Sequence, residues 1–79
     1  MTSQLTHAEY RAIFGRVVQV LRHYHPHGCS AFCVGMQVQA SARYVLGVAP
    51  TAPCPASPLE LDRLTRDVVR HLDDEPRTN

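Results

Sequence analysis

Hydrophobic residues recur along the first part of the chain at the spacing of an amphipathic helix. They form one stripe over about four turns, made of Tyr10, Ile13, Phe14, Val17, Val18, Leu21 and Tyr24. Thr6 and Glu9 have the spacing of a capping box, which begins a helix, while Pro26 disfavours helical geometry at His25. The pattern predicts a helix over about residues 6–24.

The last part of the chain carries a second helical pattern. Ser57 is suited to cap a helix, Pro58 to occupy its first position, and Glu60 to complete the capping box. An apolar stripe follows, made of Leu61, Leu64, Val68 and Leu72. The opposite face is predicted to carry ion pairs one turn apart, namely Asp62 with Arg66, Arg63 with Asp67, and Arg70 with Asp74. We expect a helix over about residues 57–74 and a frayed tail over 75–79.

Between these helices the hydrophobic period changes to two, which is typical of a half-buried strand. The alternating apolar positions of the first run are Phe32, Val34, Met36 and Val38, and those of the second are Tyr44, Leu46 and Val48. The pattern predicts strands over about 30–39 and 43–48. Because the two runs are adjacent in sequence, an antiparallel hairpin is the expected pairing.

Residues 49–56 contain Pro50, Pro53 and Pro55, a density that excludes a helix or a sheet ladder and indicates an extended connector. The expected fold class is therefore α+β: one domain over 1–79, with the order helix, strand, strand, helix. Both amphipathic helices would cover the apolar face of the hairpin, including Phe32, Val34, Met36 and Leu46. A two-stranded sheet is marginal alone, so a third short strand or a homodimer is a further expectation.

A chain of 79 residues buries only about 60% of its unfolded surface, which leaves little room for a deep catalytic cleft. We expect neither an enzyme nor a cofactor. No secretory pattern and no long apolar run is present, so we expect a cytoplasmic protein without a membrane span and with three reduced cysteines. The formal net charge is +1, and six of the seven acidic residues lie between Glu60 and Glu75.

A histidine- and cysteine-rich segment follows the first helix. It contains His23, His25, His27, Cys29 and Cys33, with Cys54 in the connector. Imidazole and thiolate are the donors that zinc prefers. On a strand, however, Cys29 and Cys33 would lie about 13 Å apart. We expect no metal site and keep a zinc-stabilised interaction domain as an alternative.

Nucleic-acid binding is a second alternative. Arg11 and Arg22 lie off the apolar stripe of the first helix, and Arg43 begins the second predicted strand. All eight basic residues are arginine, but they lack the interleaved aromatic residues of a single-strand binding surface. The sequence therefore favours a protein partner.

Two groups of residues are candidates for binding that partner. Acidic residues near the end of the last helix oppose the helix dipole and would form a negative patch for a basic partner; they are Asp67, Asp73, Asp74 and Glu75. The strand face not needed for the core would offer a docking surface with Gln37, Gln39 and Arg43. The sequence predicts a small protein-binding module.

In size and expected αβ architecture the whole chain resembles the small anti-CRISPR inhibitors of phages and other mobile elements, although no motif is shared. The resemblance implies an inhibitor that covers a nucleic-acid-binding surface of a CRISPR-type defence complex. It further implies that Asp67, Asp73, Asp74 and Glu75 occupy a groove meant for target DNA.

Overall fold

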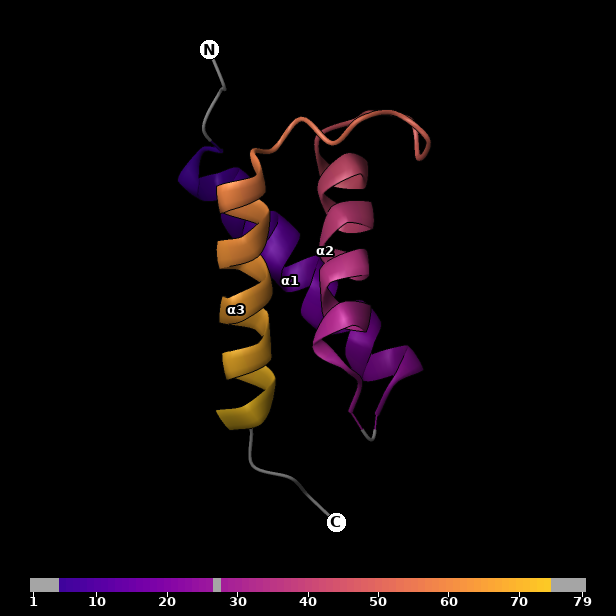
Figure 1. Ribbon diagram of the computed structural model, residues 1–79, viewed down its shortest axis with the longest axis vertical. Coiled ribbons are helices and arrows are strands. Elements are labelled where there is room, and N and C mark those ends of the chain that lie inside the picture. The colour runs from indigo at the N-terminus through magenta and orange to yellow at the C-terminus, as the bar shows by residue number, and fades with distance from the viewer. Residues whose placement is uncertain (1–4, 27, 75–79) are drawn as a thin grey trace.

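The computed structural model describes residues 5–26 and 28–74, and within them the chain forms three helices and no strand. These are α1 (His7–Tyr24), α2 (Ala31–Val45) and α3 (Pro58–Asp74). α2 and α3 lie side by side in opposite directions, and α1 crosses behind them (Figure 1). Each helix packs against the other two, so the fold is an all-α bundle.

The predicted first and last helices are confirmed, together with their capping boxes. In α1 the Thr6 hydroxyl accepts from the Glu9 amide at 3.0 Å and the Glu9 carboxylate accepts from the Thr6 amide at 2.9 Å. In α3 the Ser57 hydroxyl accepts from the Glu60 amide at 3.2 Å. Glu60 also accepts from the Leu5 amide at 2.6 Å, and this bond joins the start of α1 to the start of α3.

The predicted α+β fold is wrong. The strands over 30–39 and 43–48, their antiparallel hairpin and the possible third strand are absent from the described residues, where α2 takes their place. Ser30 caps α2 by accepting from the Cys33 amide at 3.2 Å. The helix ends at Val45 with Leu46 as its C-cap, and Gly47 follows with a φ of 74°, the conformation that glycine commonly adopts just after a helix. The Gly47 and Val48 amides bond back to the carbonyls of Tyr44 and Arg43.

The strand prediction failed because two helical series of apolar residues are interleaved. Val34 and Val38 are spaced by four and point into the core, where they are 1% and 0% exposed. Phe32 and Met36 have the same spacing but lie on the other side of α2 and are exposed. Since the two series are offset by two residues, their sum reads as a period of two. The expectation that Phe32 and Met36 belong to the core is therefore wrong.

The core lies where the three helices meet. α1 contributes four members, α2 three and α3 two; they are Ile13, Val17, Val18, Leu21, Val34, Val38, Ala42, Leu64 and Val68. α2 also approaches α3 closely at Gly35, where a Cβ would lie 3.9 Å from the Thr65 hydroxyl. The small side chains on the inner face of α2 are what allow this packing.

The predicted connector is confirmed as a segment without helix or strand: residues 49–56 link α2 to α3 (Figure 1). It is held by Arg43, whose Nε donates to the Ala52 carbonyl at 2.7 Å, and by Ala56, which is buried. The predicted tail over 75–79 lies outside the described residues. Among the described helices, none has the length and apolar character needed to span a membrane.

Candidate partner-binding surfaces

Four residues of α2 form an outward-facing row, which we call the outer ridge: Phe32, Met36, Ala40 and Tyr44. They are spaced by four, so they follow one another along one inclined row of the helix surface. Phe32 is 77% exposed, Met36 59% and Tyr44 67%. Large apolar side chains scattered singly are ordinary on a protein surface, but here three of them share one row on one helix.

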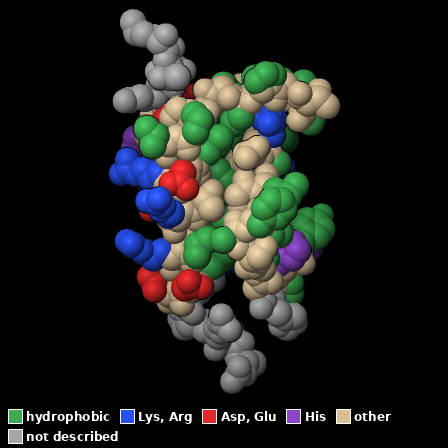
Figure 2. Space-filling view, viewed as in Figure 1, with side chains coloured by type: hydrophobic (Ala, Val, Ile, Leu, Met, Phe, Trp, Pro, Cys, Tyr) green, Lys and Arg blue, Asp and Glu red, His purple; other side chains and the backbone are tan. Residues whose placement is uncertain are grey.

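α2 is apolar on both sides. It contains no acidic residue, and Arg43 is its only basic residue. A surface helix normally carries charged residues opposite its buried face, whereas a helix that is apolar all round is normally covered on all sides. Hydrophobic side chains lie over α2 in Figure 2, whereas charged side chains line the outer edge of α3. The outer ridge is therefore the largest departure from an ordinary solvent face in this bundle.

Guanidinium groups border the Tyr44 end of the outer ridge. The Arg16 guanidinium of α1 lies over the Tyr44 ring, 3.6 Å from its centroid, in a cation–π arrangement. The Arg16 Nε atom is buried without a hydrogen-bond partner. Arg43, next to Tyr44, is half-buried. The edge of the ridge is positively charged.

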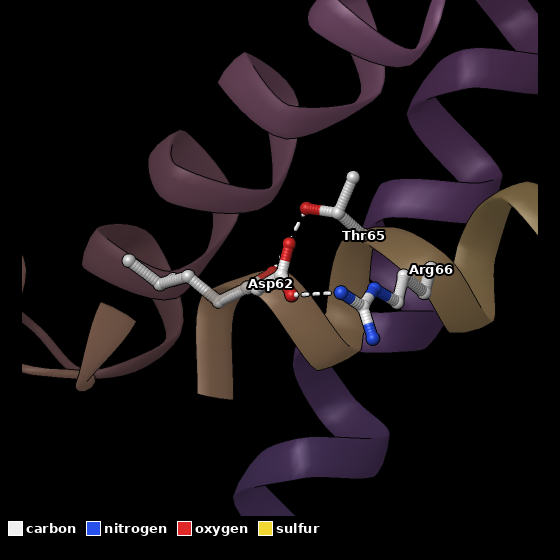
Figure 3. A network of polar contacts seen from close by, with 4 residues as sticks. Asp62, Thr65 and Arg66 are labelled. Carbon is white, nitrogen blue, oxygen red and sulfur yellow. Dashed lines mark hydrogen bonds and ion pairs between the residues drawn. The ribbon is translucent and has the colours of Figure 1, made fainter. Parts of the chain in front are cut away.

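α3 has the opposite kind of outer surface, and its polar groups are paired locally. Asp62 and Arg66, one turn apart, form an ion pair at 3.0 Å, which confirms one of the three predicted pairs. Thr65 donates to the Leu61 carbonyl at 2.8 Å. Figure 3 shows Asp62 directed at Arg66 and the Thr65 hydroxyl beside them. Such exposed pairs add little stability, but they keep this side of the helix hydrated.

A groove of about 750 Å³ runs between α1 and α3. Tyr10 donates a hydrogen bond to Asp67 across it, and the Phe14 and His71 rings meet edge to face at 5.3 Å. Burial, followed by the hydrogen bond to Asp67, raises the pKa of Tyr10 to about 12. Gly15 lines the groove, and a Cβ there would meet nothing within 4 Å. Because the lining charges are mixed, the groove selects no particular ligand charge.

The three described residues of the predicted acidic patch lie on α3, where Asp67 and Asp74 line the same groove and Asp73 does not. Asp67 is half-buried and bonded to Tyr10, Asp74 lines the groove, and Asp73 is exposed near the end of α3. Glu75 lies outside the described residues.

The other predicted docking residues belong to α2, where the expected strand face does not exist. Gln37 is half-buried and donates to the Ser41 hydroxyl at 3.0 Å, Arg43 is bonded to the connector, and Gln39 is exposed. The structure therefore divides the seven predicted site residues between α3, α2 and the undescribed tail. The sequence pattern does not indicate the outer ridge, because it predicts Phe32 and Met36 in the core.

The arginines of the nucleic-acid alternative are similarly divided. Arg11 lines the groove between α1 and α3, Arg22 is in the last turn of α1, and Arg43 is in the last turn of α2, not in a strand. They form no single row of positive charge.

The histidine- and cysteine-rich segment begins at the end of α1 and continues into the first turn of α2. Cys33 Sγ lies 3.6 Å from His25 Nε2, and Cys29 and Cys33 are both half-buried against the core. His27 lies outside the described residues. Among the others, no group of three histidine, cysteine or acidic side chains is arranged to hold a metal ion.

These geometric features are what the chain offers for a functional assignment. Comparison with known protein families, with curated proteins and with solved structures finds no match.

Proposed function

We propose that this chain is a protein-binding module whose recognition element is the outer ridge of α2. The observation that carries the proposal is the exposure of Phe32, Met36 and Tyr44 along one helical row. Contiguous exposed apolar patches often mark interaction sites. Full burial of one large apolar side chain is worth about 1.5–3 kcal/mol, so the three residues together offer several kcal/mol toward the cost of association.

The shape of the ridge favours a helix as the partner element. A row of side chains spaced by four residues fits the corresponding groove of a second helix, with the two axes crossing at about −50°. Ala40, between Met36 and Tyr44, leaves a low point in the ridge where a partner side chain can insert. An amphipathic helix laid against this face would use its own apolar row for the contact.

The charge around the ridge favours a partner with acidic residues beside that apolar row. Arg16 and Arg43 border the Tyr44 end, and α2 contains no acidic residue. A second copy of this chain, placed ridge against ridge, would offer no carboxylate to these guanidinium groups. The complementary surface is therefore that of a different protein.

The inhibitor of a CRISPR-type complex, with a cytoplasmic location, stays a prediction within this class. The resemblance to such inhibitors was based on the size of the chain and on an expected αβ architecture. The size still agrees, whereas the fold of the described residues is all-α. Asp73 and Asp74, both exposed in the last turn of α3, support contact with a basic surface. The inhibitor version therefore requires that Asp73 and Asp74 of α3 contact the partner, whereas binding through the outer ridge does not require this.

The test is capture of host proteins on the immobilised chain, followed by binding measurements with the purified partner. The double variant Phe32→Ser with Met36→Ser should lose the partner, and Phe32→Ala alone should weaken binding at least about tenfold, equivalent to 1.4 kcal/mol. Both residues are exposed, so the variants should keep the helical circular dichroism of the wild type.

Leu59→Ser is the matched control, because Leu59 is 82% exposed and this substitution removes an apolar side chain from α3 instead of from the outer ridge. It should leave binding unchanged. If Leu59→Ser and the ridge variant weaken binding equally, the contact is nonspecific and the proposal is wrong. The chain alone should be monomeric at micromolar concentration; a dimer abolished by the ridge variant would assign the ridge to a second copy and contradict us.

The charge variant Asp73→Arg with Asp74→Arg separates the inhibitor version from the general one. If those carboxylates contact a basic surface, binding weakens and becomes less sensitive to salt. If binding is unchanged while the ridge variant abolishes it, the module remains and the acidic-patch version is wrong.

A further inference from the structure

The first turn of α2 carries a pair of thiols beside an imidazole. Cys29 lies just before the Ser30 cap and Cys33 three residues after it, so the cap brings their side chains to one side of the helix start. Both side chains pack against the hydrophobic core at this end of the bundle, and Cys33 Sγ lies 3.6 Å from His25 Nε2. Cys54 belongs to the connector at the other end of α2 (Figure 1).

The two thiols of the pair have different surroundings. Cys33 faces the His25 ring, and an adjacent imidazole is the usual group that takes a proton from a nucleophilic thiol. Burial raises the pKa of the Cys29 thiol, and the hydrogen bond and charge of Cys33 raise it further. Cys29 is therefore favoured as the neutral thiol, while Cys33 is the sulfur beside a proton acceptor. This is the arrangement of a resolving and an attacking cysteine.

We propose that Cys33 and Cys29 form a modification site that a hydroperoxide oxidises to an intramolecular disulfide, with His25 positioned to take the Cys33 proton. The site is independent of the partner-binding role of the outer ridge. It also differs from a metal site, because it needs only two sulfurs and one proton acceptor.

The chemistry balances in two steps. The Cys33 thiolate attacks one peroxide oxygen, the O–O bond breaks, and the second oxygen leaves as water or alcohol after taking a proton; Cys33 becomes a sulfenic acid. The Cys29 sulfur then attacks the Cys33 sulfur, the S–O bond breaks, and hydroxide leaves as water with the Cys29 proton. Two thiols lose two electrons, and the peroxide gains them.

The chain offers a convenient readout because it contains no lysine and trypsin cuts after arginine. The fragment 23–43 holds both Cys29 and Cys33, whereas Cys54 is on fragment 44–63. After dilute hydrogen peroxide treatment of the full-length chain, we expect two of its three thiols to disappear and fragment 23–43 to lose two hydrogen atoms in mass. Oxidation of Met36 would add an oxygen and is distinguishable.

Three variants identify the roles. Cys54→Ser should form the bond at the wild-type rate. Cys29→Ser should accumulate a sulfenic acid on Cys33 that dimedone traps. His25→Gln should slow Cys33 oxidation roughly tenfold or more, whereas His23→Gln, the matched exposed histidine, should not.

A disulfide that joins fragment 23–43 to fragment 44–63 would overturn the proposal, because it would pair a different thiol. So would oxidation of Cys33 and Cys54 at equal rates without a bond to Cys29. An unchanged rate in His25→Gln would overturn the assigned role of the imidazole. The wild-type fragment map decides the pairing even where a cysteine variant does not fold.

Discussion

α2 and α3 lie side by side in the bundle and bury their inner faces in the same core, but their outer faces are opposites. α3 carries paired charges such as Asp62 and Arg66 on its outer side, and this charged face is well solvated. α2 carries the large apolar side chains of Phe32 and Met36 at the equivalent place, and both are exposed to solvent. The comparison teaches that core packing explains the apolar residues on the inner face of each helix. It does not explain the difference between the charged outer face of α3 and the apolar outer face of α2.

The largest expected effect tests the shared inner core. Leu64 of α3 is fully buried, whereas Leu59 of the same helix is 82% exposed. Leu64→Ala should lower the free energy of unfolding by about 2–5 kcal/mol, because it removes apolar contacts and leaves a cavity. Leu59→Ala should change it by less than about 0.5 kcal/mol. Urea unfolding followed by circular dichroism measures both, and equal effects would contradict the described packing of α3.

The next prediction tests the role of Gly47 in ending α2. Gly47 has a φ of 74°, which costs a residue with a side chain roughly 1–2 kcal/mol, so Gly47→Ala should destabilise by about that amount. Gly15→Ala is the matched control, because a Cβ there meets nothing within 4 Å and alanine favours the helix interior by up to about 1 kcal/mol. The two substitutions should therefore shift the thermal midpoint in opposite directions; a loss in both would mean that Gly15 has a structural role.

A smaller effect on stability is expected from a double substitution that makes the outer face of α2 resemble that of α3. Phe32→Glu with Met36→Lys gives α2 a charged pair one turn apart, like that of α3. Unfolding free energy should stay within about 0.5 kcal/mol of the wild type, while binding of a hydrophobic dye and of the captured partner should fall. A large loss of stability instead would show that Phe32 or Met36 supports the fold.

The smallest effect is confined to alkaline solution and concerns the bridge between α1 and α3. Because the folded-state pKa of Tyr10 is raised to about 12, its contribution to stability is complete below the unfolded pKa near 10 and is lost as the pH rises through the folded value. Absorbance of phenolate should show one of the three tyrosines titrating near pH 12. Tyr10→Phe should remove this late component; if it persists in that variant, it belongs to another tyrosine.

Local signals were sufficient for α1 and α3. Each has a capping box and a single apolar stripe, so the sequence predicted their bounds to within a residue or two. In the structure α2 has Ser30 as its N-cap and Gly47 just after its end, but the alternation of Phe32, Val34, Met36 and Val38 led to the prediction of a strand. The sequence placed Asp73 and Asp74 in the last helix, where the structure also has them, whereas it placed Phe32 and Met36 in the core, although both are exposed.

The sequence by itself therefore determined two capped amphipathic helices, a proline-rich connector and the apolar character of the segment between them. Only the tertiary structure decided that this segment is helical and which of its two apolar series is buried. The physical reason is that both series have the same spacing and similar hydrophobicity, so local preference does not rank them. Packing does, because the smaller Val34, Val38 and Ala42 let α2 approach its neighbours closely and leave the bulkier Phe32, Met36 and Tyr44 on the outside.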